Sequence, residues 1–332
     1  MHGSDRKLLW VSSSRAPYLD VPKWLEEMLT ESFPGMRVVI GRDEETVNRE
    51  IEDAEIFVSW KLLPEQFARC RKLRWVHSTS AGVGQILIPA LVASSVIVTN
   101  ATTVHAIPVA EHAIALIFAL SRRLADSFKY QSKSTWGHAA IWHGAHLPGE
   151  LNGATLGLVG LGAIGGEIAR RARALDMRVV AVKRNLSRGG DLADRIYPPG
   201  QLSRMLEAAD YIVLAAPETP ETRHIIGGSE LRMMKRTACV INVSRGALID
   251  TAALIGALRE GTLAGAALDV TDPEPLPDGH PIWNAPNIFI THHTGSATGR
   301  LWLRQSELFH NNLRRYLAGE PMLNLVEKQR GY

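Results

Sequence analysis

The chain has 332 residues, of which 45% are hydrophobic and 21% are charged, and its formal net charge is +3. This length allows two domains with sizeable cores, and the composition is that of an ordinary globular protein. The small net charge and the lack of a dense basic stripe outside residues 183–188 argue against nucleic acid as a partner. The longest uninterrupted apolar run, residues 113–120, is too short to span a bilayer. Cys70 and Cys239 lie in or beside apolar segments, which favours a reduced, cytoplasmic protein.

Short apolar runs alternate with helical patterns over the first hundred residues. Helices are expected near 22–32, 43–52 and 64–70, and strands at 7–12, 37–40, 55–59, 73–77 and 96–99. This alternation predicts a flavodoxin-like parallel sheet. A second alternating series runs from about 104 to 294, and a last helix near 299–318 ends at Gly319.

A glycine-rich turn follows the strand expected at 155–159. The turn reads Gly160-Leu-Gly-Ala-Ile-Gly165, and apolar residues at helical spacing follow it. Strand, turn and helix in this order form a dinucleotide-binding motif. Gly160 permits the turn, Gly162 lets the backbone approach a pyrophosphate, and Gly165 lets the helix pack closely on the strand. We therefore expect cofactor contacts from Gly160, Gly162, Ala163, Ile164 and Gly165; a glycine-rich loop without a ligand is the alternative.

The next strand is expected at 177–182, and the basic residues Lys183 and Arg184 follow it. NAD-binding folds usually have Asp or Glu here, to hold the ribose 2′-hydroxyl. A carboxylate would repel the 2′-phosphate of NADP, whereas Lys and Arg would pair with it. Arg188 is a candidate for a weaker contact of the same kind. The sequence therefore favours NADP over NAD, and the alternative is a solvated basic loop.

Three polar residues follow predicted strands further along the chain. Arg245 follows the strand that begins at Cys239, Glu274 follows a strand at 265–270, and His293 follows the strand that begins at Asn287. Residues at the carboxyl ends of parallel strands point into the ligand crevice. An arginine fork suits a substrate carboxylate and the neighbouring carbonyl oxygen. A histidine beside a carboxylate suits proton donation near neutral pH. The set fits the reduction of a 2-oxo acid, which needs a hydride from a nicotinamide and a proton.

Several segments together resemble the D-isomer-specific 2-hydroxyacid dehydrogenases over nearly the whole chain. They read VHSTSAGVG, VAEHAIALIFALSRRL, LGLVGLGAIG, INVSRGAL, ALDVTDPEPL and NIFITHHTGSAT. The resemblance implies that Arg245 binds and polarises the substrate, that His293 donates the proton and that Glu274 holds His293. It also implies that Asp269 contacts the nicotinamide end, that the backbone of Ser80, Ala81 and Gly82 holds the substrate carboxylate, and that Ala216 and Pro217 flank the adenosine.

The sequence departs from the family pattern at three places. His292 replaces the usual proline before the catalytic histidine, so two histidines compete for that role, and alignment on the strand at Asn287 favours His293. Asp176 replaces the glycine that usually ends the helix after the nucleotide turn, which alters a helix cap. The third departure is the basic pair described above.

The resemblance also implies a domain division and an assembly. Residues 1–101 and 297–332 would form a discontinuous substrate (catalytic) domain, and residues 102–296 a Rossmann dinucleotide-binding domain. Residues 109–124 are apolar around most of a helix, so this helix should be buried on several sides. The family uses it as a dimer contact, and we therefore expect a homodimer.

The favoured function is reduction of a 2-oxo acid by NADPH, with glyoxylate, hydroxypyruvate or a larger 2-oxo acid as substrate. The alternatives are an NAD-dependent D-2-hydroxyacid dehydrogenase working oxidatively and a dinucleotide-sensing, corepressor-like binding protein. Trp60, at the end of a predicted strand, is a candidate for the substrate pocket. No metal site is expected, because the spacing of His138, His143 and His146 fits no helix face.

Overall fold

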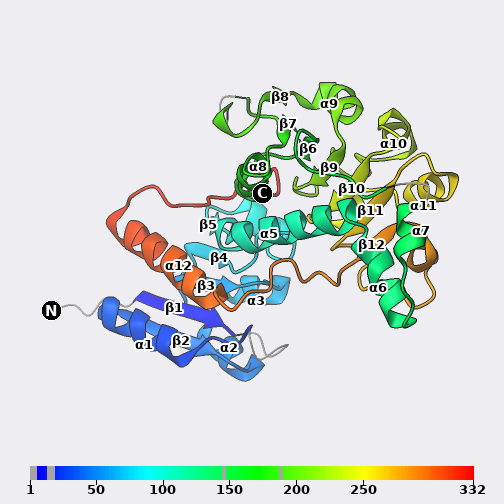
Figure 1. The fold of residues 1–332 in the computed structure, drawn as a ribbon. Helices are drawn as coiled ribbons and strands as arrows, with labels where there is room; N and C mark the ends of the chain where they lie inside the picture. The colour runs from blue at the N-terminus through cyan, green and yellow to red at the C-terminus, as the bar shows by residue number, and fades with distance from the viewer. Residues whose placement is uncertain (1–5, 13–18, 144–146, 187–189) are drawn as a thin grey trace. The chain divides into compact units, whose positions relative to one another are not determined.

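The computed structural model describes residues 6–12, 19–143, 147–186 and 190–332 (Figure 1). His146 and Arg188 lie outside the described residues. The chain divides into two compact units, which we call unit 1 (residues 1–105 and 298–332) and unit 2 (residues 106–297). Each unit contains one parallel β-sheet flanked by helices.

The sheet of unit 1 has five parallel strands in the order β2-β1-β3-β4-β5. This is the flavodoxin-like order expected from the sequence. The strands are β1 (Arg6–Val11), β2 (Met36–Gly41), β3 (Ile56–Ser59), β4 (Trp75–Ser78) and β5 (Ile97–Thr99). Because β3 and β4 are buried along their whole length, their apolar runs lack the alternation of a half-exposed strand.

Helices cover both faces of this sheet. One face packs against α1 (Lys23–Ser32) and α12 (Leu301–Ala318), through Leu25, Phe309 and their neighbours. The other face packs against α2 (Glu44–Glu50), α3 (Pro64–Arg69) and α4 (Pro89–Ala93). The long helix α12 ends at Gly319, whose φ of 68° is the left-handed conformation that glycine adopts without strain.

The sheet of unit 2 has seven parallel strands in the order β12-β11-β10-β9-β6-β7-β8. They are β6 (Thr155–Val159), β7 (Arg178–Val182), β8 (Arg195–Tyr197), β9 (Tyr211–Leu214), β10 (Cys239–Asn242), β11 (Gly265–Leu268) and β12 (Ile288–Ile290). Strand order reverses between β6 and β9, as in the Rossmann fold, and ligands of such sheets bind at the carboxyl ends of the strands beside this reversal.

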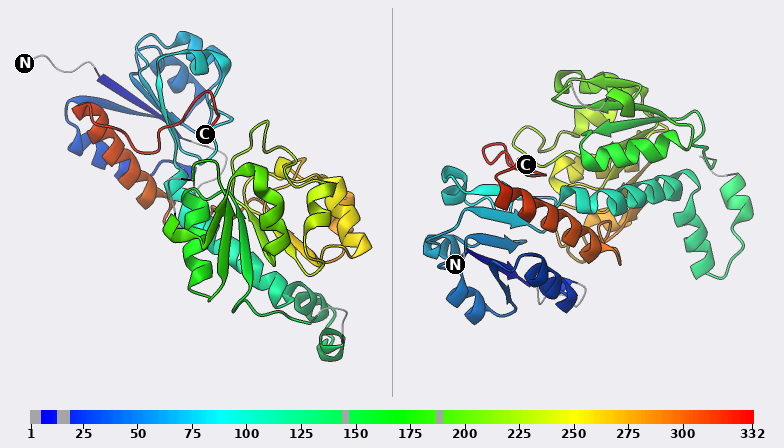
Figure 2. Two further views of the ribbon diagram at one scale, coloured as in Figure 1. Left: turned by 90° about the horizontal axis from the view of Figure 1, so that it is seen from above. Right: turned by 90° about the vertical axis from the view of Figure 1, so that its left-hand side faces the viewer.

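Two sets of helices enclose the sheet of unit 2 (Figure 2). Helix α8 (Ala163–Arg173) and α5 (Thr102–Ser121) pack on one face through Ile168, Ala169 and Leu116. The other face packs against α9 (Leu202–Ala208), α10 (Gly228–Met233) and α11 (Thr251–Glu260). The unit also contains α6 (Leu124–Ser132), α7 (His138–Trp142) and the 3₁₀ helices η2 (Gly190–Leu192), η3 (Pro199–Gln201), η4 (Gly246–Leu248) and η5 (Pro281–Asn284).

The helix expected at 109–124 has different bounds in the structure. Helix α5 begins at Thr102, continues through Pro108 and ends at Ser121. Arg123 has a left-handed backbone with a φ of 53°, which an α-helix cannot contain, so α6 starts as a separate helix. By length and composition α5 could cross a membrane, with a mean hydropathy of 1.6, but 56% of this apolar stretch is buried inside the structure, as in a core helix.

Candidate active site

Arg245, Glu274 and His293 follow three adjacent strands of the unit 2 sheet. Arg245 comes after β10, Glu274 after β11 and His293 after β12. Because the strands are parallel, their carboxyl ends meet at one edge of the sheet. The structure therefore assembles at one sheet edge the three residues that the sequence spreads over almost fifty positions.

The turn that carries Arg245 is closed by Asn242. The Asn242 side chain accepts a hydrogen bond from the Ser244 N–H at 3.1 Å and donates one to the Arg245 carbonyl oxygen at 2.8 Å. Gly246 follows, and a Cβ atom at this position would lie 2.0 Å from the carbonyl carbon of Thr271. Only glycine lets the turn after β10 approach the segment after β11 so closely. Sequence reasoning did not single out Asn242, although it lies within the INVSRGAL motif.

Glu274 and His293 form a direct pair. The Nδ1 atom of His293 lies 2.5 Å from Oε1 of Glu274, and both side chains are partly exposed. A carboxylate can only accept, so Nδ1 carries the hydrogen and Nε2 is the ring nitrogen left to face a ligand. His292 instead packs against Trp283, with ring centroids 6.2 Å apart. Of the two competing histidines, His293 is therefore the one with a carboxylate partner.

The loop that carries His293 is organised by Asp269. The Asp269 carboxylate, only 4% exposed, accepts hydrogen bonds from the Thr291 hydroxyl at 2.7 Å and from the backbone N–H groups of Thr294 and Gly295 at 3.0 Å. The carbonyl oxygen of Asp269 accepts the N–H of His293 at 2.7 Å. These bonds surround His293, whose φ of 53° is unusual for a residue other than glycine.

The ionisation of Asp269 follows from these contacts. Burial by itself would raise its pKa, but hydrogen bonds from His112, Thr291 and the Gly295 backbone more than offset this and hold the pKa well below its ordinary value. The group therefore stays a carboxylate at neutral pH. The sequence resemblance implied a contact between Asp269 and the nicotinamide end; within the protein, the carboxylate binds the 291–295 loop.

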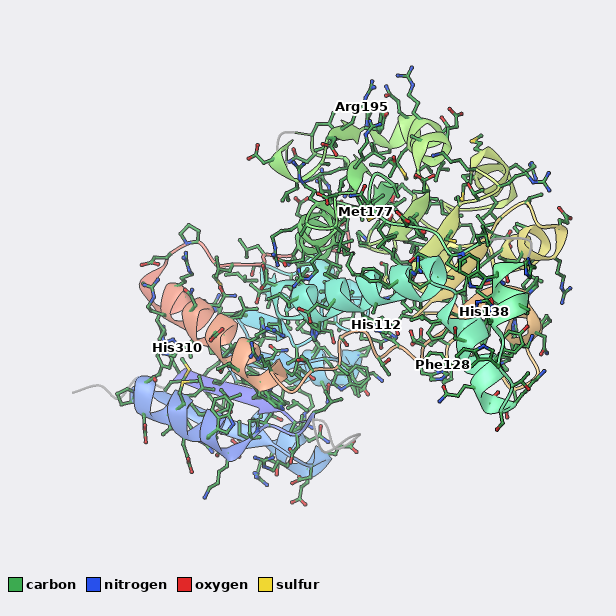
Figure 3. The ribbon with its side chains drawn as sticks, in the orientation of Figure 1. His112, Phe128, His138, Met177, Arg195 and His310 are labelled. Carbon is green, nitrogen blue, oxygen red and sulfur yellow. The ribbon has the colours of Figure 1, made fainter. Side chains whose placement is uncertain are left out.

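His112 completes this group and was not predicted as a site residue. Figure 3 labels it on α5. Its Nε2 atom lies 2.9 Å from the Thr291 hydroxyl oxygen and 3.3 Å from the Asp269 carboxylate. Because the Thr291 hydroxyl donates to Asp269, it accepts from His112, whose Nε2 therefore carries a hydrogen. The only sequence signal for His112 was its place in the VAEHAIALIFALSRRL segment.

The glycine turn after β6 has the geometry of a dinucleotide site. Gly160 has a φ of +98°, and a Cβ there would lie 2.8 Å from backbone atoms of Ala215. A Cβ at Gly165 would lie 2.2 Å from the Gly160 carbonyl oxygen. The backbone of α8 therefore packs so closely against the backbone of the turn that no side chain fits between them. Gly162 precedes α8 and faces open space. The N–H groups at the start of α8, at Ala163 and Ile164, suit a pyrophosphate there.

The loop after β9 lies on the other side of the strand-order reversal. The Ser244 hydroxyl donates to the carbonyl oxygen of Ala216, and the Thr222 hydroxyl donates to that of Pro217 at 2.7 Å. Ser244 directly precedes Arg245, so the expected adenosine-flanking loop is linked by a hydrogen bond to the turn that carries the arginine.

Lys183 and Arg184 follow β7, the strand next to β6. The backbone N–H of Lys183 donates to the Tyr197 carbonyl oxygen at 3.0 Å. The pKa of Glu221, in the loop after β9, is lowered by hydrogen bonds from Thr219 and its own backbone and by the charge of Arg184.

Asp176, after α8, has a left-handed φ of 58°, the conformation for which glycine is the common residue.

The predicted carboxylate loop Ser80-Ala81-Gly82 belongs to unit 1, where it follows β4. The Ala101 N–H donates to the Ser80 carbonyl oxygen at 3.0 Å, and the Asn100 side chain donates to that of Ala81 at 3.0 Å. Trp60 follows the neighbouring strand β3, also at its carboxyl end.

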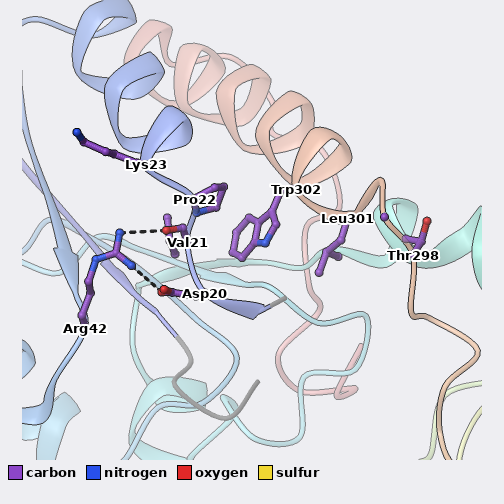
Figure 4. Close-up of a pocket in the computed structure, with 9 residues that line it drawn as sticks. Asp20, Val21, Pro22, Lys23, Arg42, Thr298, Leu301 and Trp302 are labelled. Carbon is purple, nitrogen blue, oxygen red and sulfur yellow. Dashed lines mark hydrogen bonds and ion pairs between the residues drawn. The ribbon is translucent and has the colours of Figure 1, made fainter. Parts of the chain in front are cut away.

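Unit 1 also contains a cavity of about 600 Å³ that none of the predicted site residues lines (Figure 4). Its wall includes Trp302 and Arg42. The Arg42 guanidinium is already paired with the Asp20 carboxylate at 2.6 Å and donates to the Val21 carbonyl oxygen at 3.0 Å.

His138 and His143 lie at α7, where the His138 ring is 5.7 Å from that of Trp142. Within the described part of the chain, no three His, Cys, Asp or Glu side chains gather in a group that could hold a metal ion.

The fold and these residues together define a nicotinamide-dependent oxidoreductase. The family model for the NAD-binding domain of D-isomer specific 2-hydroxyacid dehydrogenases matches residues 114–295. A glyoxylate reductase of Korarchaeum cryptofilum is 35% identical over 306 residues, which cover 90% of this chain and 88% of the relative. The chain belongs to the D-isomer specific 2-hydroxyacid dehydrogenase family, and it is an NAD(P)-dependent enzyme that interconverts a 2-oxo acid and a 2-hydroxy acid.

Solved structures agree with this assignment. A D-isomer specific 2-hydroxyacid dehydrogenase from Xanthobacter autotrophicus, in complex with NADPH and MES, is 29% identical with a TM-score of 0.81, and the match covers 98% of this chain and 99% of that one. D-Lactate dehydrogenase from Aquifex aeolicus, complexed with NAD and lactic acid, is 25% identical with a TM-score of 0.75, covering 96% and 99%. The relatives thus include complexes with both cofactors.

Proposed function

We propose that this enzyme reduces a small 2-oxo acid, such as glyoxylate or hydroxypyruvate, with NADPH. The observation that carries the proposal is the Glu274–His293 pair, at the same sheet edge as Arg245 and as the glycine turn. The resemblance to a glyoxylate reductase supports the substrate class.

Each residue of the set has a distinct role in this proposal. The nicotinamide, when bound, supplies the hydride that adds to C2 of the substrate. Arg245 binds the carboxylate and polarises the C2 carbonyl, since its planar fork can contact both groups. His293 donates a proton from Nε2 to the oxygen that becomes the alkoxide. Glu274 accepts from Nδ1, which orients the ring. One hydride and one proton thus convert the C2 carbonyl to a hydroxyl.

The preference for NADPH rests on Lys183 and Arg184. Both follow β7, where an NAD-specific site would have a carboxylate for the ribose hydroxyl. Contacts from Gly160, Gly162, Ala163, Ile164 and Gly165 would hold the pyrophosphate, and Ala216 and Pro217 would flank the adenosine. Asp269 would act at the nicotinamide end, through the loop that it holds or by direct contact.

We assign the dinucleotide-binding domain to unit 2 and the substrate domain to unit 1. The assignment of unit 2 is supported by the family model for the NAD-binding domain, which matches residues 114–295. In unit 1 the backbone of Ser80, Ala81 and Gly82 would bind the substrate carboxylate, and Trp60 would line the same pocket.

We further propose a cytoplasmic homodimer. Three aromatic side chains in and between α6 and α7 are strongly exposed: Phe128 at 57%, Trp136 at 90% and Trp142 at 63% (Figure 3 labels Phe128). Exposed aromatic side chains that gather in one region are typical of an interface. Cys70 and Cys239 are free thiols, as in a protein kept reduced.

An assay of cofactor oxidation tests the function. Glyoxylate, hydroxypyruvate and phenylpyruvate are each supplied with NADPH and with NADH, and the loss of reduced-cofactor absorbance is followed. We expect turnover with NADPH and at least one of these acids. Turnover only in the oxidative direction with NAD would indicate the dehydrogenase alternative. Tight cofactor binding with no turnover in either direction would indicate a sensor.

A further inference from the structure

The carbonyl oxygen of Thr79, directly before the Ser80-Ala81-Gly82 loop, accepts hydrogen bonds from two side chains. Gln305 of α12 donates from Nε2 at 2.7 Å, and His105 of α5 donates from Nε2 at 3.1 Å. A carbonyl oxygen has two lone pairs and accepts both bonds. The N–H of Thr79 donates to the Ser59 carbonyl oxygen at 3.2 Å, so Thr79 is held on both sides.

The amide of Gln305, only 2% exposed, is oriented by a line of buried polar groups. The Trp75 indole donates to the Thr99 hydroxyl oxygen at 2.8 Å, and that hydroxyl lies 2.8 Å from Nδ1 of His77. The Gln305 side chain interacts with His77 in turn. By hydrogen-bond geometry, the buried atoms His77 Nε2 and Gln305 Oε1 have no partner among the described residues.

One assignment of hydrogens is compatible with all of these contacts and leaves complementary groups on His77 and Gln305. The Thr99 hydroxyl accepts from Trp75 and donates to His77 Nδ1, which leaves the hydrogen of a neutral ring on Nε2, facing Gln305 Oε1. The ring is neutral because complete burial lowers the pKa of His77 to about 3. With its oxygen facing His77, the amide must present its NH₂ group to Thr79. A buried amide held in this way has a single orientation.

The Thr79 anchor fixes the first peptide of the loop, whose other end, the Ser80 N–H, donates to the Ser78 hydroxyl oxygen at 3.2 Å. The carbonyl oxygens of Thr79, Ser80 and Ala81 are all bound by neighbouring protein groups: Gln305 and His105, the Ala101 N–H, and Asn100. In a trans peptide the C=O of one residue and the N–H of the next point in opposite directions. The N–H groups of Ala81 and Gly82 therefore point away from these bonds, and neither has an acceptor among the described residues.

We propose that Gln305 is a positioning residue for the substrate: by holding the Thr79 carbonyl, it fixes the peptide at which the loop begins, and so places the loop whose Ala81 and Gly82 N–H groups bind the carboxylate of the 2-oxo acid. The inference rests on the proposed function of the 80–82 loop and adds the residue that sets the geometry of this loop. Gln305 does not itself touch the substrate in this proposal.

The test compares Gln305→Met with Asn312→Leu. Asn312 is a second fully buried amide on α12, but it bonds the backbone of Leu323 at 2.7 and 3.0 Å, away from the loop. Both variants should lower the Tm, because each removes buried hydrogen bonds. Only Gln305→Met should raise the KM for glyoxylate, by roughly tenfold, the size expected for loss of one buried hydrogen bond. The KM for NADPH should not change in either variant.

An Ala81→Asp variant tests the loop itself, since a carboxylate placed there repels an anionic substrate. If Ala81→Asp raises the KM for glyoxylate but Gln305→Met raises it no more than Asn312→Leu, the positioning role is wrong and the loop's role stands. If Ala81→Asp leaves this KM unchanged, the proposed carboxylate site is wrong and the inference fails with it.

Thr99→Val keeps the test decisive if Gln305→Met does not fold. It removes the buried hydroxyl that bonds both Trp75 and His77, with little change in shape. We expect a smaller rise in the KM for glyoxylate, of roughly two- to fivefold, because the amide of Gln305 loses part of its orientation. An unchanged KM in a folded Thr99→Val variant would overturn the proposal.

Discussion

Nδ1 of His293 lies 2.5 Å from Oε1 of Glu274. The pair joins the segment after β12 to the segment after β11, and the adjacent His292 takes no part in it, because its ring packs against Trp283. In the proposed role of His293 as proton donor, this hydrogen bond selects the nitrogen that acts, since Nδ1 is engaged and Nε2 is not.

Replacing His293 by Asn should lower kcat for 2-oxo acid reduction by about 10²–10⁴-fold, the usual contribution of general acid catalysis. The KM for NADPH should change little. His292→Asn is the matched control, because it removes an imidazole one residue away that contacts Trp283. Steady-state kinetics of both variants check the prediction, and a larger loss in His292→Asn would contradict it.

Replacing Glu274 by Gln should lower kcat for 2-oxo acid reduction, by less than the loss of the imidazole itself. The charged acceptor of the Nδ1 hydrogen is replaced by a weaker neutral one, so the ring is held less firmly. The control is Asp272→Asn, since Asp272 lies two residues away and pairs with Arg223 at 3.4 Å. Steady-state kinetics of both variants provide the check, and an unchanged kcat in Glu274→Gln would rule out this role.

Replacing Asp269 by Asn should lower both the Tm and kcat. An asparagine places an NH₂ group against one of the N–H donors of the 291–295 loop, so at least one hydrogen bond becomes a repulsion. Because the pKa of Asp269 is depressed by folding, its stabilising contribution is present above the ordinary value of 3.8 and is lost as pH falls below it.

The difference in Tm between the Asp269→Asn variant and the unmodified protein should therefore persist at pH 5 and narrow below about pH 4. Thermal unfolding over this range measures it. Asp278→Asn, a change at an exposed position of the same unit, should leave the Tm unchanged. A difference that already disappears between pH 7 and pH 5 would show that the carboxylate is not held as the structure indicates.

Neutralising Lys183 and Arg184 together, as Lys183→Ser with Arg184→Ser, should raise the KM for NADPH and leave that for NADH nearly unchanged. One charge-assisted hydrogen bond to the 2′-phosphate corresponds to about 10–100-fold discrimination. Because Arg184 is exposed to solvent, we expect a discrimination near the lower end of this range. Arg204→Ser, at an exposed arginine of α9, is the control. Equal values of kcat/KM for NADPH and NADH in the unmodified enzyme would contradict the prediction.

Light scattering should give about twice the single-chain mass of 36.4 kDa. Phe128→Asp should reduce this mass, because it places a charge among the exposed aromatic side chains of the α6–α7 region. Trp24→Asp, at a comparably exposed aromatic residue on α1, should not. A mass of one chain for the unmodified protein at micromolar concentration would reject the dimer.

Much of the fold follows from local patterns in the sequence. The alternation of short apolar runs with helical spacing predicts two parallel sheets. Each strand or helix has an apolar face to bury, and the pattern of that face is visible within the element's own short stretch of sequence. The glycine turn after β6 is also local, since Gly160 and Gly165 lie five positions apart and meet within one strand–turn–helix unit. The elements that the sequence did not predict, such as β8 and α4, are three and five residues long and too short to show a period.

Tertiary structure decided the contacts between distant parts of the chain. Whether Glu274 meets His292 or His293 depends on how β12 pairs with β11 and on the loop that Asp269 holds. His112 and Thr291 are 179 positions apart, and Thr79 and Gln305 are 226 positions apart. A sequence pattern reports the surroundings of a residue along the chain, whereas these hydrogen bonds exist only after strand order and helix packing bring the partners together. For that reason the roles of His112 and Gln305 emerged from the folded structure alone, while the pairing of Glu274 with His293 was implied only by the family resemblance.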